Sequence, residues 1–210
     1  MKRANQHALL RLTCVIGAAA LMGACASPEP TLHTLSLRAE APVADAGRFQ
    51  RAFRLSAVRV PDRLDKPQIV LRTSDSQVQE LEQQRWAAPF GTELRDALSA
   101  NLASTLSAVD LNDAAAPAGV PLYRIGADVQ AFDAWPGQNV SALVTWRVAR
   151  DAGKPAGALT CQTTLTEPAG NEVDAVVAAT QRVVQQWSQR IAQSVQSLEA
   201  PGAGAPAWCR

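Results

Sequence analysis

Apolar and polar residues alternate most regularly in the second half of the chain. Apolar residues occupy every second position from Tyr123 to Ala131, with Arg124, Asp128 and Gln130 between them. The pattern returns from Val140 to Val148, and after a tight-turn sequence it continues through residues 158–166. A period of two is typical of strands with one covered face. These segments predict an antiparallel meander of three strands.

Shorter alternating segments precede this meander. Residues 32–37 and 53–57 predict two strands, and the phase slips at residues 58–60, which indicates a bulge or a strand buried on both faces. Residues 69–72 and 78–81 flank a polar turn and predict a hairpin.

Two segments show helical spacing instead. The first begins near Pro89, which suits the first helical position, and Glu93 complements the positive end of the helix dipole. Its apolar stripe consists of Phe90, Leu94, Ala97, Leu98, Leu102 and Leu106. The second runs from Val173 to Leu198 and stops before Pro201-Gly202. Its polar side is rich in Gln and is either a solvent surface or a self-association seam, so a homo-oligomer is an open alternative.

Together these elements predict an α+β fold. We expect a mostly antiparallel sheet of about six strands, with two amphipathic helices packed on one face. The expected single domain spans residues 32–199, and residues 200–210 form a C-terminal tail.

The N-terminus has the pattern of a bacterial lipoprotein export signal. Lys2 and Arg3 precede an apolar run over residues 12–21, which is too short to span a bilayer, and small residues lead to Cys25. We expect residues 1–24 to be removed and Cys25 to carry the acyl chains. Residues 25–31 then form the acylated cysteine and its tether. The alternative is an ordinary secretory signal with an incidental cysteine.

Export also changes the expectation for the remaining cysteines. Cys161 and Cys209 would meet an oxidising compartment, where they are candidates for a disulfide that pins the tail. Alternatively, Cys161 is a buried thiol on a core-facing strand position and Cys209 is free.

Composition argues against several functions. Without residues 1–24 the chain keeps 17 basic and 19 acidic residues and contains no Lys/Arg run. The sequence therefore offers no basic segment of the kind that binds nucleic-acid phosphates. His33 is the one histidine left, and it lacks the partners of a catalytic triad or a zinc site. We therefore expect no enzyme activity, no metal and no cofactor.

The tryptophans are candidates for either core or contact positions. Trp146 and Trp187 lie on apolar stripes and are expected in the core. Trp86, beside Arg85, is either a staple under the first helix or a partner-docking anchor, and Trp135 in a turn is a further docking candidate.

Three ordered stretches carry a family resemblance. They are residues 60–64 with 69–75, residues 85–90 with 94–102, and residues 187–192. Together with the export signal they resemble the ABC-type transport auxiliary lipoproteins of the paraquat-inducible protein C type. The Cys161/Cys209 pair is not an expected feature of that family.

The resemblance implies a location and a partner. It implies an outer-membrane lipoprotein on the periplasmic face, partnered with an MCE-domain protein of the inner membrane, in a system that moves lipids between membranes. Ala26 fits the outer membrane, because Asp at that position would favour inner-membrane retention. The implied role is docking, for which an edge of the 69–81 hairpin is one candidate surface. Two alternatives remain open: a lipid carrier holding an acyl chain, and a regulator of an envelope enzyme.

Overall fold

The computed structural model describes residues 28–36, 49–151, 156–200 and 205–209. The predicted signal peptide and the predicted lipidation site at Cys25 lie outside these residues. The chain divides into two units, residues 1–30 and residues 31–210, and the second contains all of the secondary structure described below.

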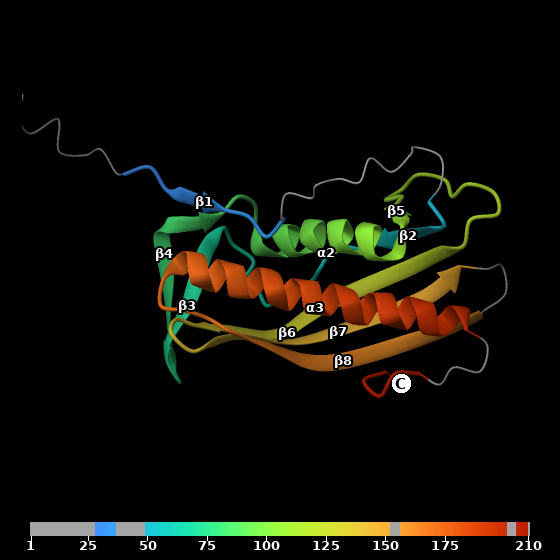
Figure 1. Ribbon diagram of the computed structural model, residues 1–210. Helices are drawn as coiled ribbons and strands as arrows, with labels where there is room; N and C mark the ends of the chain where they lie inside the picture. The colour runs from blue at the N-terminus through green and yellow to red at the C-terminus, as the bar shows by residue number, and fades with distance from the viewer. Residues whose placement is uncertain (1–27, 37–48, 152–155, 201–204, 210) are drawn as a thin grey trace, which may run out of the picture. The chain divides into compact units, whose positions relative to one another are not determined.

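The fold has ten described elements in two sheets and two helices (Figure 1). The strands are β1 (Thr31–His33), β2 (Arg51–Leu55), β3 (Gln68–Ser74), β4 (Gln77–Trp86), β5 (Ala108–Asp110), β6 (Leu122–Trp135), β7 (Asn139–Asp151) and β8 (Ala156–Pro168). The helices are α2 (Phe90–Leu106) and α3 (Val173–Glu199).

The larger sheet has the strand order β5-β2-β6-β7-β8. Strands β6, β7 and β8 form the predicted antiparallel meander, whereas β2 pairs in parallel with both β5 and β6. The phase slip at residues 58–60 corresponds to the point where β2 has ended and Arg59 makes an isolated parallel bridge to Asp128.

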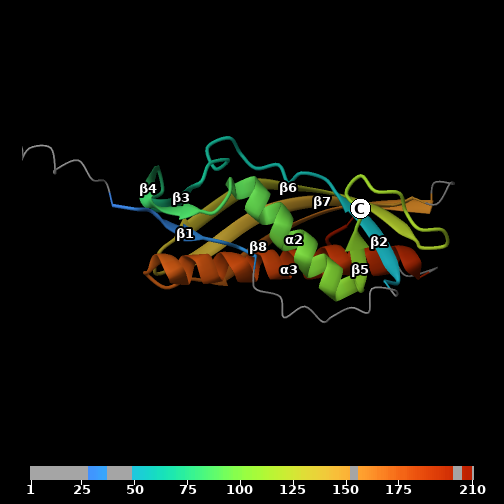
Figure 2. The ribbon, with the colours of Figure 1, turned by 90° about the horizontal axis from the view of Figure 1, so that it is seen from above.

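The smaller sheet has the order β1-β4-β3 and contains the predicted hairpin, with β1 added in parallel at its edge. Arg72 on β3 donates a hydrogen bond to Asp133 on β6 at 2.6 Å, which links the two sheets. In both ribbon views β1, β3 and β4 lie at the opposite end of the domain from β2 and β5 (Figures 1 and 2).

The α+β class is therefore confirmed, but the single six-stranded antiparallel sheet is only partly matched. There are two mixed sheets, because β1, β2 and β5 find parallel partners. Alternating apolar residues predict which face of a strand is covered. They do not specify whether the neighbouring strand runs parallel or antiparallel.

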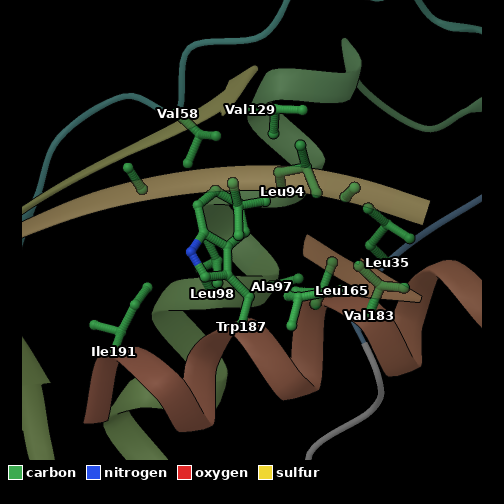
Figure 3. Packing of buried hydrophobic residues seen from close by; sticks show 14 of the residues in the cluster. Leu35, Val58, Leu94, Ala97, Leu98, Val129, Leu165, Val183, Trp187 and Ile191 are labelled. Carbon is green, nitrogen blue, oxygen red and sulfur yellow. The ribbon is translucent and has the colours of Figure 1, made fainter. Parts of the chain in front are cut away.

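The core lies between the helices and the larger sheet. Helix α3 packs across β7 and β8, and α2 packs against α3 and beside β5. Trp187, Leu98 and Ile191 are almost fully buried in this layer (Figure 3). None of the helices in the described ranges is long and apolar enough to cross a bilayer.

Candidate functional site

The segment that follows the expected tether is bound into the domain on three sides. Strand β1 pairs with the end of β4, from Gln84 to Trp86. The buried Glu93 carboxylate of α2 accepts hydrogen bonds from the Thr34 hydroxyl and the Leu35 backbone N–H, both at 2.8 Å. Gln181 of α3 donates to the Thr34 carbonyl at 3.0 Å. A pull on the N-terminus would therefore be transmitted to β4, α2 and α3.

Leu35 completes this attachment with an apolar contact. Its side chain is buried and belongs to the same cluster as Leu94, Val183 and Trp187 (Figure 3). Burying one leucine contributes about 1.5–3 kcal/mol. The segment is thus fixed both by charge-assisted hydrogen bonds and by the core.

Strand β4 presents an exposed edge next to this segment. Its pairing with β1 is confined to residues 84–86, so residues 77–83 have no strand on that side among the residues that the structure describes. Val78 is 48% exposed there, and most of its neighbours are exposed polar residues. Unpaired backbone groups of this kind can accept a strand from another chain.

The docking candidates lie at the same end of the domain but are not equally available. Trp86 is buried and stacks on Phe90, with ring centroids 5.4 Å apart, which is the arrangement expected of a staple under the start of α2. Arg85 is partly exposed and hydrogen-bonds the Glu82 carbonyl at 2.7 Å. Trp135 is half-buried at the end of β6, beneath the guanidinium of Arg72 at 5.8 Å.

The C-terminal tail lies along the outer strand of the larger sheet. Cys209 is joined to Cys161 of β8 by a disulfide, and the Gln162 N–H donates to the Trp208 carbonyl at 2.9 Å. Trp208 also receives the Arg190 guanidinium over its ring at 4.0 Å. The fully buried Ser194 hydroxyl lies beside both sulfur atoms and accepts a hydrogen bond from the Trp146 indole.

A partly exposed ion pair holds the end of α3. Arg51 donates two hydrogen bonds to the Glu199 carboxylate, at 2.7 and 2.8 Å, and the Tyr123 hydroxyl donates a third at 2.8 Å. The Arg51 hydrogen bond holds the pKa of Glu199 below its usual value, against the opposing effect of burial. Burial, followed by the hydrogen bond to Glu199, raises the pKa of Tyr123 to about 12.

The described residues contain no group of three or more side chains suited to a metal ion. His33 lies with its Nε2 2.6 Å from the Gln84 side-chain oxygen and its Nδ1 3.6 Å from Asp174. These contacts hold the His33 ring in place as a residue of strand β1. Sequence reasoning missed the Glu93 and Glu199 contacts, because each joins segments that are far apart in the chain.

The fold and these contacts define an α+β domain whose N-terminal segment is hydrogen-bonded to both helices. Residues 33–192 match the family described as the ABC-type transport auxiliary lipoprotein component, and the chain belongs to this family. The family is one of membrane-anchored transport auxiliaries rather than a class of enzymes. No curated protein sequence matches the chain.

Solved structures share the fold. An uncharacterized protein has a TM-score of 0.62 at 20% identity, over 80% of this chain and 99% of the other. A Xanthomonas campestris protein of the DUF330 family has a TM-score of 0.51 at 16% identity, over 78% of this chain and 91% of the other.

Proposed function

We propose that the protein is a lipid-anchored docking component of an MCE-type ABC lipid transport system, located on the periplasmic face of the outer membrane. Family membership supports the auxiliary role, and the sequence before Cys25 supports the anchor. The observation that carries the proposal is the attachment of residues 34 and 35 to the Glu93 carboxylate, because an anchored domain must be held firmly at the point where its tether enters.

The tether limits how the domain meets the membrane. The six Cα-to-Cα steps from Cys25 to Thr31 can extend at most about 22 Å. Acyl chains on Cys25 would therefore keep β1, and with it the small sheet, near the bilayer. Two or three chains on one cysteine hold a protein stably, whereas a single chain does not.

The exposed edge of β4 is the proposed docking surface, and Arg85 lies at its end on the same strand. Trp135 lies farther away, beneath Arg72 of the neighbouring strand β3. A strand of the MCE-domain protein would pair along residues 77–83, where main-chain hydrogen bonds give affinity and Val78 offers an apolar contact. This surface is available without any rearrangement of the core.

The lipid-carrier alternative receives less support from the packing. The space beneath the small sheet, between Trp86, Phe90, Phe132 and Val176, measures about 10 Å³. Such a volume holds one water at most, far less than an acyl chain. The docking role needs no interior cavity.

Site-specific photocrosslinking in cells tests the docking surface. A photoreactive amino acid at Val78 should crosslink to an MCE-domain protein, whereas the same amino acid at Thr164, which is exposed on β8, should not. Equal yields from both positions, or none from Val78 with the partner expressed, would overturn the proposed surface.

Proline at neighbouring positions of β4 provides a second test. Backbone N–H groups of successive residues point to opposite sides of a strand, so Gln79→Pro and Glu80→Pro remove donors from opposite edges. One variant should lose partner capture and keep its melting temperature, and the other should lose stability. Partner capture that survives in both variants would contradict strand addition.

A further inference from the structure

A hollow of about 620 Å³ lies over β2 and the neighbouring strands β6 and β7. Four arginines line it: Arg54 on β2, Arg95 on α2, Arg124 on β6 and Arg147 on β7. Asp113 is the one carboxylate among the residues that line it. The hollow is therefore rich in cationic side chains, although the chain as a whole is nearly neutral.

The sheet register places the strand arginines close together. Arg54 lies directly opposite Arg124 in the parallel pairing of β2 and β6, and Arg147 lies opposite Gly126 in the next pair. Like charges at facing positions of a sheet destabilise it. Such an arrangement becomes favourable when an anion lies between the charges.

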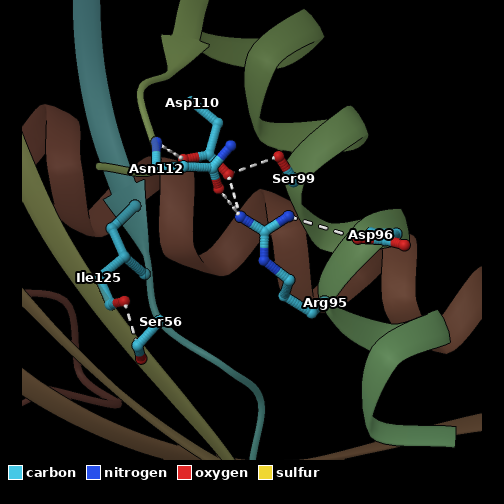
Figure 4. Close-up of polar contacts among 7 residues, drawn as sticks. All are labelled: Ser56, Arg95, Asp96, Ser99, Asp110, Asn112 and Ile125. Carbon is cyan, nitrogen blue, oxygen red and sulfur yellow. Dashed lines mark hydrogen bonds and ion pairs between the residues drawn. The ribbon is translucent and has the colours of Figure 1, made fainter. Parts of the chain in front are cut away.

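Internal carboxylates neutralise only part of this charge. Arg95 is bound to Asp110 at 2.8 Å and also contacts Asn112 and Asp96 (Figure 4). Arg124 pairs with Asp151 at 2.7 Å.

The other two arginines have no carboxylate partner among the residues that the structure describes. The Arg54 side chain donates to the Ala114 carbonyl at 2.9 Å, and the Arg147 guanidinium makes no hydrogen bond or ion pair within the same ranges. Two guanidinium groups therefore remain available to a ligand.

The floor of the hollow leaves room for a ligand. Gly126 has no side chain between Arg124 and Arg147, and a Cβ atom there would have only the Ser56 hydroxyl within 4 Å, at 3.8 Å. Ala149 adds apolar surface, whereas the side chains of Leu55 and Ile125 are buried in the core. A hollow of this volume accommodates an organic ester as well as a bare inorganic ion.

We propose that this hollow binds the phosphate group of an organic phosphate, with Arg54 and Arg147 as its main ligands and Arg124 as a third. The planar guanidinium presents two parallel donors that match phosphate oxygens. The phosphate can belong to a water-soluble ester or to a glycerophospholipid head group. The inference rests on these residues alone and does not depend on the docking role.

Calorimetry on the purified, acylated protein in detergent tests the site. Two probes are used at low salt: glycerol 3-phosphate and dihexanoyl phosphatidylglycerol. We expect saturable binding of at least one probe, weakened about tenfold or more by Arg54→Gln or Arg147→Gln, because each change removes charge-assisted hydrogen bonds. Arg63→Gln is the matched control, since Arg63 is exposed and lies outside the hollow, and it should leave binding unchanged.

A second variant acts on the floor instead of the arginines. Gly126→Glu places a carboxylate inside the hollow and should abolish binding while the circular dichroism spectrum stays unchanged. Binding of the lipid probe alone would identify a head group as the ligand, and binding of both probes would identify phosphate esters in general. Triglutamate, an anion without phosphate, serves as the control ligand. The proposal would be overturned if neither probe bound, if triglutamate bound equally well, or if binding persisted in the Arg54→Gln, Arg147→Gln and Gly126→Glu variants.

Discussion

The Glu93 carboxylate lies 2.8 Å from the backbone nitrogen of Leu35, and this contact fastens the start of the domain to helix α2. Glu93 is only 6% exposed, and it accepts a second hydrogen bond from Thr34. A charged acceptor with two donors in a buried position is stronger than an ordinary surface contact. It joins the segment that follows the expected tether to the core.

Replacing Glu93 by Ala should lower the free energy of unfolding by about 2 kcal/mol, because a buried N–H loses its charged acceptor. Urea unfolding followed by tryptophan fluorescence measures the change. Asp96→Ala is the control, since its carboxylate is more than half exposed on the same helix, and it should cost less than about 0.5 kcal/mol. Equal effects of the two variants would show that the Glu93 contact does not stabilise the segment.

The Arg51, Glu199 and Tyr123 cluster makes stability depend on pH at both extremes. The pKa of Glu199 is lowered in the folded protein, so its contribution is present above the unfolded value of about 4.5 and is lost as the pH falls through the folded pKa. The pKa of Tyr123 is raised from 10.0 to about 12, so the stability that it contributes is lost as the pH rises between these values.

Glu199→Gln should therefore flatten the acid side of a plot of melting temperature against pH. Glu82→Gln removes one exposed carboxylate that only reaches Arg85, and it serves as the control. If the melting temperature of Glu199→Gln fell at acid pH as steeply as that of the native protein, the contact between Arg51 and Glu199 would be contradicted.

The Cys161–Cys209 disulfide closes a loop with a sequence separation of 48 residues. On the chain-entropy model such a closure contributes about 4 kcal/mol. The double variant Cys161→Ser/Cys209→Ser should unfold at lower urea concentration, and reduction should weaken the native protein but leave the double variant unchanged. Labelling of both cysteines in the unreduced, denatured protein would show that the bond does not form in the exported chain.

The elements of this fold follow closely from residue patterns, but their partners do not. The apolar stripe from Phe90 to Leu106 predicts α2, because apolar spacing depends on local geometry, although Pro89 is the N-cap and not the first helical residue. Strand β2 is equally visible in the sequence, yet its pairing with β6 depends on contacts about seventy residues away. Nothing in a five-residue strand specifies whether its neighbour runs in parallel.

The candidate sites show the same division. The tail cysteines and the N-terminal pattern are recognisable because each is a local signal of residue type. The arginine hollow is not, since Arg54, Arg124 and Arg147 become neighbours only through the order β2-β6-β7. Arginines at outward-facing positions of three strands were the one available signal, and without the strand order they resemble ordinary surface charges.

The central claim is that Cys25 carries the lipid that holds the domain at the outer membrane. Intact-mass spectrometry of the N-terminal peptide from fractionated membranes tests this most directly. The account predicts a mature chain that begins at Cys25, carries diacylglycerol and an amide-linked acyl chain, and is found in the outer-membrane fraction, with Cys25→Ser abolishing all three. A soluble periplasmic protein with an unmodified mature N-terminus would contradict it.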